Sequence, residues 1–339
     1  MKEVSTVGLD IAKRVFQVHG VDRDGAVVVR RSLRRCELLA WFGKLAGCVV
    51  GLEACATAYY WGRELQKLGH EVRLIPPAYA KAYVRRNKND AADAAAICEA
   101  ALRPSMRLVA MKSVEQQAAA GVHRVRDLLM KQRRMLGNQI RGLMAEFGMV
   151  AAKGRRGLGE LRAILADKED RRIPALLRES LLRAAQSWGD LERELAGLDR
   201  QIVASGRSDA TYRHLITAPG YGPILSSAMS AMVVNPAAFR RSGDFAASLG
   251  LVPRQEGTGG RVKLGPISKR GNAYLRRLLV NAAMSVLNSK WARRDPWLAR
   301  LLASKKRKVA AVALANKMAR IGWALMTRQE DYRSLPKAA

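Results

Sequence analysis

The first hundred residues alternate strand-forming runs with helical patterns, and this order limits the possible folds more than any other feature of the chain. Strands are expected at 4–9, 14–20 and 26–30, with the turn sequence Asp22-Arg23-Asp24-Gly25 between the second and third. A helix is expected at 34–46, followed by an apolar strand at 48–52, a helix at 58–68, a strand at 72–75 and an Ala-rich helix at 90–102. The region is therefore expected to be an α/β domain that begins with a three-stranded meander.

This order of elements is that of an RNase H-like fold, in which the first and fourth strands are parallel neighbours. Asp10 ends the first strand and Glu53 ends the fourth, so both carboxylates are expected where ligand crevices form in parallel sheets. Asp90 and Asp93 are three residues apart at a helix start and share a face. Taken alone, Asp10 could instead cap a helix beginning at Ile11, and Asp90 could be a helix N-cap.

Four converging carboxylates repel one another unless cations neutralise them, and Mg²⁺ prefers oxygen ligands of this kind. The sequence therefore predicts a magnesium site formed by Asp10, Glu53, Asp90 and Asp93. Two ions about 3.5–4 Å apart would activate a nucleophile and stabilise the leaving oxygen of a phosphodiester.

The middle of the chain, at about 111–205, has a helical pattern with Pro174 as its one proline. Apolar residues recur at helical spacing at Val122, Val125, Leu128, Leu129 and Leu136, and again at Leu191, Leu195 and Leu198. We expect an antiparallel helical hairpin or coiled-coil arm with its turn at 153–157. A plain helical spacer and a dimerisation arm both satisfy the pattern.

A mainly helical unit is expected from about 210 onward. Residues 216–228 indicate a helix-hairpin-helix-like element, in which Gly220 and Gly222 would let a phosphate approach the backbone and the next helix N-terminus. A tight turn between two packing helices is the alternative. The expected domains are 1–108, 109–207 and 208–339.

The charge of the chain indicates a polyanionic partner. Lys and Arg number 60 against 29 Asp and Glu, giving a net charge of +31. A generally basic proteome is the alternative explanation. The four cysteines form no CxxC pair and the four histidines are scattered, so a zinc site is not expected. A charged N-terminus and the lack of a long apolar run indicate a cytoplasmic protein that does not cross a membrane.

Several motifs carry a family resemblance. They are Gly8-Leu9-Asp10-Ile11-Ala12-Lys13, Gly51-Leu52-Glu53-Ala54, Lys88-Asn89-Asp90-Ala91-Ala92-Asp93-Ala94, Pro219-Gly220-Tyr221-Gly222-Pro223, Ile267-Ser268-Lys269-Arg270-Gly271-Asn272 and Ala313-Leu314-Ala315-Asn316-Lys317-Met318-Ala319-Arg320. They resemble the DEDD transposases of the insertion-sequence 110 family, most closely its 1111 subgroup, and the related Piv invertases. The resemblance extends over nearly the whole chain.

The resemblance implies a RuvC-like catalytic domain, a coiled-coil arm and a C-terminal transposase domain that cut and rejoin DNA at the bacterial nucleoid. It also implies that an element-encoded guide RNA selects both DNA partners. In such proteins a homo-oligomer, a dimer or tetramer, forms sites to which two subunits contribute.

The family's nucleophile is a serine just before a glycine, which forms a covalent phosphoserine link to DNA. The corresponding stretch here is Arg254-Gln255-Glu256-Gly257-Thr258-Gly259-Gly260-Arg261, which contains no serine. Aligning the glycines puts Thr258 at or next to that position, and a shift of one residue puts Gly257 there. Ser268 is the nearest serine downstream. A threonine hydroxyl is a competent nucleophile once a base or metal activates it.

Basic residues flank both candidate sites and are expected to contact nucleic acid. They are Arg85, Arg86, Lys88, Lys263, Lys269, Arg270, Arg276 and Arg277. The leading hypothesis is an RNA-guided recombinase. The alternatives are a RuvC-like endonuclease that cuts without covalent capture and a non-catalytic nucleic-acid-binding descendant of a transposase.

Overall fold

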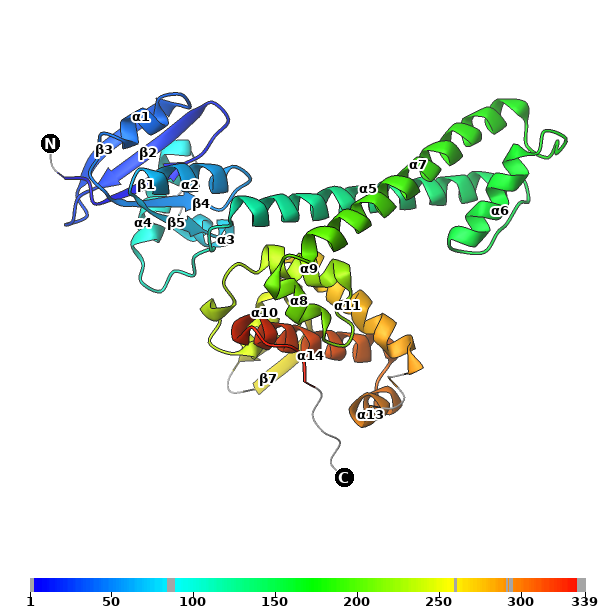
Figure 1. Ribbon diagram of the computed structural model, residues 1–339. Helices are drawn as coiled ribbons and strands as arrows, with labels where there is room; N and C mark the ends of the chain where they lie inside the picture. Colours follow the sequence, from blue (N-terminus) through cyan, green and yellow to red (C-terminus); the bar gives the residue numbers. More distant parts are fainter. Residues whose placement is uncertain (1–2, 84–88, 259–260, 291, 293–294, 334–339) are drawn as a thin grey trace. The chain divides into compact units, whose positions relative to one another are not determined.

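The computed structural model describes residues 3–83, 89–258, 261–290, 292 and 295–333 (Figure 1). The chain forms two compact units, Met1–Ser113 and Val114–Ala339. The first is a mixed α/β unit and the second is mostly helical.

The N-terminal unit is built on a five-stranded mixed sheet with strand order β3-β2-β1-β4-β5 (Figure 1). Its strands are β1 (Thr6–Asp10), β2 (Val15–Val21), β3 (Val27–Arg34), β4 (Val49–Glu53) and β5 (Glu71–Ile75). β1 pairs antiparallel with β2, and β2 with β3, whereas β4 is parallel to both β1 and β5. The helices are α1 (Leu38–Phe42), α2 (Ala58–Lys67), α3 (Pro77–Ala80) and α4 (Asp90–Leu102), with a 3₁₀ turn, η1, at Lys81–Tyr83. The α/β class and the expected order of elements are confirmed.

The two faces of the sheet carry different kinds of packing because residues alternate across each strand. Val7 and Leu9 of β1 belong to a buried core that also contains Phe42 of α1 and Trp61 and Leu65 of α2. Gly8 lies on the opposite face, against α4. The central strands are thus covered on both sides, as expected for continuous apolar parallel strands.

The sequence predicts the ends of β3 and α1 incorrectly. Strand β3 runs to Arg34 because β2 pairs with it along its whole length, to Val15↔Arg34, and Leu33 is buried. The helix expected at 34–46 is accordingly confined to Leu38–Phe42. β3 is an edge strand, and its charged residues are the kind that protect an exposed edge.

The C-terminal unit begins with an arm of three helices, α5 (Val114–Glu146), α6 (Arg155–Ala166) and α7 (Ala175–Gly206). Ion pairs Arg126–Asp199 and Arg133–Glu192, both at 2.5 Å, show that α5 and α7 pack antiparallel. The expected helical hairpin is present, but its turn is not at 153–157. Gly154 is the N-cap of α6, so a third helix lies within the connection between the two long ones.

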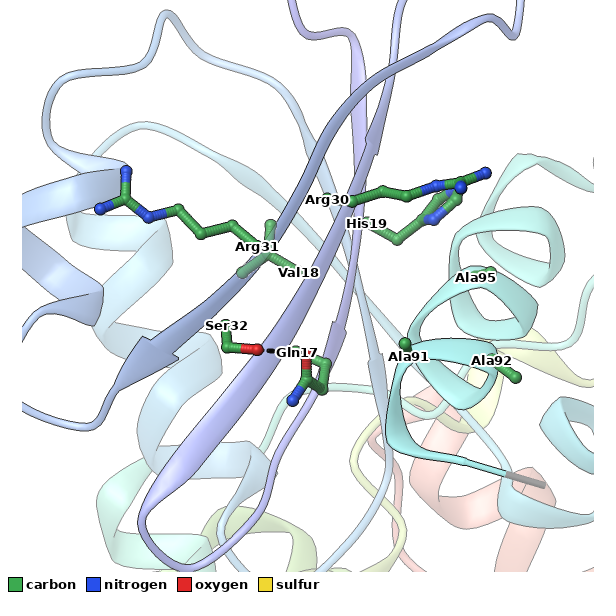
Figure 2. A pocket seen from close by; sticks show the side chains of 9 residues that line it. All are labelled: Gln17, Val18, His19, Arg30, Arg31, Ser32, Ala91, Ala92 and Ala95. Carbon is green, nitrogen blue, oxygen red and sulfur yellow. Dashed lines mark hydrogen bonds between the residues drawn. The ribbon is translucent and has the colours of Figure 1, made fainter.

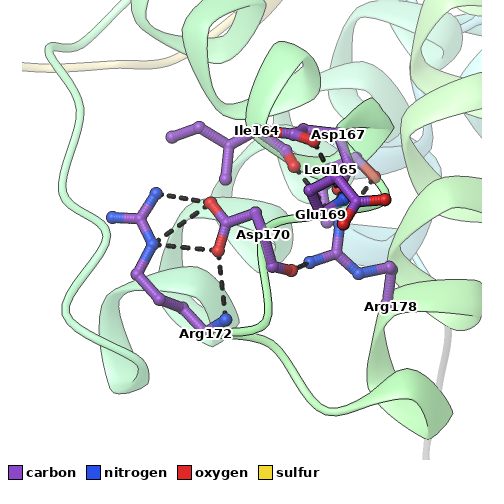
Figure 3. A network of polar contacts seen from close by, with 7 residues as sticks. All are labelled: Ile164, Leu165, Asp167, Glu169, Asp170, Arg172 and Arg178. Carbon is purple, nitrogen blue, oxygen red and sulfur yellow. Dashed lines mark hydrogen bonds and ion pairs between the residues drawn. The ribbon is translucent and has the colours of Figure 1, made fainter.

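The connection from α6 to α7 is held by Arg178 (Figure 3). Its guanidinium donates to the carbonyl oxygens of Leu165 at 3.0 Å and Asp167 at 2.7 Å, and also to that of Asp170. Hydrogen bonds from Arg172 lower the pKa of the Asp170 carboxyl to about 2. The arginine therefore satisfies carbonyl groups at the C-terminal end of α6 that the helix itself leaves without partners.

The rest of the unit, in its described residues, is a helical core with a β-hairpin. Its elements are α8 (Ala210–Ile216), α9 (Pro223–Met232), η2 (Pro236–Ala238), α10 (Ser242–Ser248), β6 (Pro253–Thr258), β7 (Arg261–Ile267), α11 (Ala273–Asn288), α13 (Pro296–Ser304) and α14 (Arg307–Arg328). Helix α14 is long and apolar enough to cross a membrane by length and composition alone, a property that the sequence analysis did not predict. In this structure α14 is a core helix, with Leu314, Met318 and Leu325 buried.

A buried polar network joins the start of the arm to this core. His123 of α5 is 1 % exposed, and its two ring nitrogens lie 3.0 Å from the hydroxyls of Tyr274 in α11 and Ser227 in α9. Burial lowers the pKa of His123 to about 4, and the positive charge of Arg126 adds to this effect. The imidazole is therefore neutral at pH 7.

Candidate active site

Asp10 and Glu53 end neighbouring parallel strands. β1 and β4 pair in the register Gly8↔Gly51 and Leu9↔Leu52, which brings the next residues, the two acids, to the same end of the sheet. Each acid is two residues beyond a glycine of that register, so it shares the face on which α4 lies. Described residues 11–14 do not form a helix, so Asp10 is not a helix cap.

Two glycines allow α4 to lie directly on the sheet. A Cβ on Gly8 would lie 2.1 Å from the carbonyl oxygen of Ala94, and a Cβ on Gly51 would lie 2.7 Å from the Cβ of Ala101. Real side chains do not tolerate such distances, so any other residue would push the helix away. The absence of side chains at these positions therefore sets the height and direction of α4.

Asp90 and Asp93 continue the face of α4 that contacts the sheet. Ala94 and Ala101 contact the sheet glycines, and Asp90 precedes Ala94 by four residues, on the same side of the helix. Asn89 caps the helix by accepting the Ala92 N–H at 2.7 Å, so Asp90 is the first helical residue and not the cap. Ala94 lies over Gly8, and the Cys98 thiol one turn later lies 3.8 Å from the Thr6 carbonyl oxygen, so the helix start lies beyond Gly8 on the side of Asp10.

The four acids act on one another electrostatically, and we call this group the acid corner. The half-buried Asp10 carboxyl has a pKa raised to about 6. Burial is the largest cause, and the negative charges of Asp93, Asp90 and Glu53 each add to it. Within the described part of the chain, however, no three Asp, Glu, His or Cys side chains are grouped closely enough to hold a metal ion. The donor set suits a hard divalent cation, which would relieve this repulsion by drawing the carboxylates together.

The second candidate region is the glycine-rich stretch that contains Thr258. Its described residues form a β-hairpin and not a loop. β6 and β7 pair antiparallel up to Thr258↔Arg261, so Thr258 is the last described residue before the tip. Gly257 pairs with Val262 inside the ladder. Ser268 is at the opposite end, where its N–H donates to the Val252 carbonyl at 2.8 Å. Thr258 and Ser268 therefore occupy different ends of the same ribbon.

The base of the hairpin is fixed by a close crossing of two backbone segments. Gly250 has φ +70° and would place a Cβ 2.4 Å from the Arg270 carbonyl oxygen. Lys269 itself has φ +55°, a left-handed conformation that costs a non-glycine residue energy. Asn272 then caps α11 by accepting the N–H groups of Tyr274 and Leu275. This geometry leaves Lys269 and Arg270 exposed.

The predicted basic contacts divide into two groups. Lys263, Lys269 and Arg270 are exposed, and no side-chain partner is recorded for them within the described residues. Arg276 donates to the carbonyl oxygens of Leu249 and Arg270, and Arg277 pairs with Asp127 and lies 5.2 Å from the ring centre of Tyr274. Arg85, Arg86 and Lys88 lie outside the described residues. Arg276 and Arg277 thus have structural partners that the sequence did not reveal.

The segment between α8 and α9 contains the two predicted phosphate-binding glycines. Gly220 has φ +82°, and a Cβ there would lie 2.7 Å from Met318 of α14, so this glycine serves packing. The buried Tyr221 hydroxyl donates a hydrogen bond to the Met318 carbonyl at 2.8 Å, a contact that the sequence did not predict. Gly222 is exposed, faces open space and is the N-cap of α9. Of the two glycines, Gly222 is the one that a ligand could reach.

Comparisons with known proteins place the chain among transposases. Residues 212–298 match the family described as "Transposase IS116/IS110/IS902 family", and residues 7–149 match the DEDD transposases of the IS110 type. The "Probable family 20 transposase" of Pseudomonas aeruginosa is 48 % identical over 97 % of this chain and 99 % of its own length. The transposase of insertion sequence element IS1111A from Coxiella burnetii is 40 % identical over 98 % of this chain and 92 % of its own length. The transposase of insertion sequence element IS1328 from Yersinia enterocolitica is 37 % identical over 97 % of this chain and 98 % of its own length.

The matched families and relatives define the class of this protein: it is a DNA transposase with a DEDD domain. The chain belongs to the IS110 family of insertion-sequence transposases. The family resemblance seen in the sequence motifs is confirmed.

Proposed function

We propose that the acid corner is a magnesium-dependent site for DNA strand cleavage within an RNase H-like, RuvC-like domain. The observation that carries this proposal is the Asp10 carboxyl, whose pKa is raised to about 6 by burial and by three neighbouring acids. Groups with such perturbed pKa values are concentrated at functional sites. The strand order β3-β2-β1-β4-β5 is the one that an RNase H-like sheet requires.

The four carboxylates would hold Mg²⁺, which supplies charge neutralisation and a more acidic attacking hydroxyl. Asp10 and Glu53 come from adjacent strand ends and Asp90 and Asp93 from one helix turn, so three rigid elements define the site. Half-burial of Asp10 limits the access of water and strengthens every charge interaction there. The four carboxylates would thus hold a cation that offsets the negative charge of a phosphodiester bound there.

Substitution of single acids tests this proposal. Asp10→Asn and Asp93→Asn should abolish Mg²⁺-dependent strand cleavage while nucleic-acid binding is retained. Glu64→Gln is the matched control, because Glu64 is a carboxylate of the same unit on α2, where it forms an ion pair with Lys67 at 2.8 Å. Full cleavage by Asp10→Asn would contradict the proposal.

We further propose that strand exchange proceeds through a covalent link to Thr258. Its hydroxyl oxygen would form the new bond to phosphorus while the bond from phosphorus to the leaving deoxyribose oxygen breaks. The proton lost by the Thr258 hydroxyl balances the proton that the leaving oxygen takes up, and attack of a second strand end on the phosphorus would release Thr258 and rejoin the DNA. The position of Thr258 beside the tip of an exposed ribbon supports this role. Gly257 lies inside the ladder and Ser268 at the hairpin base, which makes both positions less suitable.

A denaturing gel of reacted, labelled DNA separates this proposal from the second candidate function, an endonuclease that cuts without covalent capture. The second candidate is favoured by the lack of a serine in residues 254–261. Protein attached to a strand end, lost in Thr258→Ala and restored in Thr258→Ser, supports covalent capture. Cleavage without any protein–DNA adduct supports the endonuclease. A loss of both activities in the intact protein would indicate a non-catalytic binding protein.

The proposed partners are the element DNA, its target DNA and an element-encoded guide RNA, in the bacterial cytoplasm at the nucleoid. The net charge of +31 supports polyanionic partners. Exposed Lys263, Lys269 and Arg270, together with the reachable Gly222, are the proposed contacts in the C-terminal unit. Nucleic-acid affinity should fall with a log–log salt slope of several units, and a flat salt dependence would contradict phosphate-dominated binding.

We also propose that the arm, acting as a coiled coil, mediates assembly of a dimer or tetramer. Val125, Leu128 and Met135 of α5 are 50, 54 and 70 % exposed, and their spacing places them on one side of the helix. Such a stripe of exposed apolar side chains is typical of an interface. Sedimentation as a monomer with RNA and DNA bound would refute the assembly.

A further inference from the structure

A groove lies between the β2–β3 hairpin and α4, and we call it the α4 groove (Figure 2). Its volume is about 430 Å³. The strand side is formed by Gln17, Val18, His19, Arg30, Arg31 and Ser32, and the helix side by Ala91, Ala92 and Ala95. A second hollow shares His19, Arg30, Ala92 and Ala95 with it, so the groove continues along the helix.

The strand register connects this groove to the acid corner. Asp10 pairs with Gln17, and Gln17 pairs with Ser32, so these residues form one row across the sheet. The next row consists of Gly8, His19 and Arg30. Directly paired residues project on the same side of an antiparallel sheet, so both rows face α4. The groove therefore begins one strand away from Asp10.

The helix side of the groove also begins at the acid corner. Ala91 and Ala92 lie between Asp90 and Asp93 in the first turn of α4. Small side chains on this side leave width along the helix, and Ala92 and Ala95 are part-exposed. A chain-like ligand that entered the groove would reach the carboxylates at its end.

The strand wall is cationic and rich in hydrogen-bonding groups. Arg30 is exposed and forms no ion pair with the described residues. Burial and the charge of Arg30 lower the pKa of His19, which leaves a neutral imidazole at pH 7. Gln17 and Ser32 bond to each other at 2.8 Å. The carboxylate that lines the second hollow, Glu99, forms an ion pair with Arg103 at 2.6 Å.

Arg31 provides an internal comparison. It pairs in register with Val18, which is buried in the core on the other face of the sheet. Figure 2 shows the Arg30 and His19 side chains together on the side of α4, whereas the Arg31 side chain extends away from them. Arg31 also borders the groove, but its side chain extends away from α4, so Arg30 is the arginine whose guanidinium lies on the α4 side.

We propose that the α4 groove binds the sugar–phosphate backbone of the DNA strand that is cut at the acid corner, with Arg30 as a phosphate-contacting positioning residue. The proposal rests on the proposed cleavage function of that corner. DNA is favoured over RNA because the groove leads into the carboxylates where the scissile phosphate would lie. Contacts to the backbone position a strand without reading its sequence, so the groove would accept many target sequences.

The test compares Arg30→Ala with Arg31→Ala in full-length protein, with Asp10→Asn added to both to prevent cutting. Affinities for a DNA oligonucleotide and for an RNA of the same sequence are measured over a range of salt concentrations. Arg30→Ala should weaken DNA binding several-fold and reduce the log–log salt slope by about 1, while Arg31→Ala should do neither. Ala95→Leu, which keeps helix propensity but fills the groove, should also weaken DNA binding.

Equal DNA affinities for the two arginine variants would overturn the groove proposal. A loss confined to RNA would overturn it too, because the occupant would then be an RNA. Neither result bears on whether the acids cut DNA. Conversely, unimpaired cleavage by Asp10→Asn alone would refute the acid corner as the cutting site, whatever the groove binds.

Discussion

The acid corner and the Thr258 hairpin are held in place by different means. The acids extend from buried strands and from a helix that contacts the sheet backbone at Gly8 and Gly51. The hairpin is a two-stranded ribbon whose residues 253–257 and 263–266 are exposed. An isolated pair of strands has little stability of its own, whereas the strands and helix around the acids share one core. The strands and the helix that carry the acids are therefore fixed by packing, whereas the hairpin has less packing to hold it.

The largest expected effect of a substitution comes from the contact between the sheet and α4. Gly8→Ala would place a Cβ 2.1 Å from a backbone oxygen, so α4 must move and the Met1–Ser113 unit should lose about 3 kcal/mol or more. Hydrogen exchange resolved to β1 and α4 measures this loss. Gly121→Ala is the control, because Gly121 faces open space in α5 and the change should stabilise by about 0.5–1 kcal/mol. Unchanged protection of β1 in Gly8→Ala would contradict the packing argument.

The second-largest effect is expected at His123, which is buried in the packed part of the C-terminal unit. The folded pKa of His123 is lowered from 6.5 to about 4, so the unfolded chain takes up the proton first as pH falls. Stability of the Val114–Ala339 unit should therefore decrease by about 2 kcal/mol between pH 7 and pH 5. Urea unfolding at several pH values measures it. His123→Gln should abolish most of this dependence, and an identical pH profile in the variant would exclude His123 as its source.

The smallest effect on stability is expected at the hairpin tip. Thr258→Ala should change the free energy of unfolding by no more than about 0.5 kcal/mol, because the adjoining ribbon is exposed. Its effect on the covalent protein–DNA adduct should nevertheless be complete. Thermal unfolding and a denaturing gel on the same samples separate the two quantities. A large loss of stability would contradict the expected small structural role of Thr258. An adduct that persists in Thr258→Ala and disappears in Ser268→Ala would identify Ser268 as the nucleophile.

The sequence predicts the acid corner better than its surroundings. Apolar runs that end at Asp10 and Glu53 define strand ends directly, and the spacing of Asp90 and Asp93 defines a helix face. The function of Gly8 and Gly51 could not be predicted, because it depends on which helix lies against them. A signal for the α4 groove does exist in the alternation Gln17-Val18-His19 and Arg30-Arg31-Ser32, but it requires the register of two strands.

The C-terminal unit was harder to predict because its signals are ambiguous. Glycines at 257 and 265 are typical of a loop, yet they lie within the two strands of a hairpin. Basic residues near a candidate site look alike in sequence, although Arg276 and Arg277 bind carbonyls and a carboxylate of their own unit while Lys269 is exposed. The proposed division at 109 and 208 separates the arm from the C-terminal core, whereas the buried His123 network links the arm's first turns to that core.

The central claim is that the four carboxylates bind divalent cations, and the most direct measurement is anomalous scattering from crystals grown with Mn²⁺ in place of Mg²⁺. The account predicts anomalous peaks bounded by Asp10, Glu53, Asp90 and Asp93, with the carboxylates drawn closer than in the cation-free protein. Asp93→Asn crystals should show weaker peaks or none. Carboxylates that stay spread over more than about 12 Å, with no peak between them at saturating Mn²⁺, would contradict the claim.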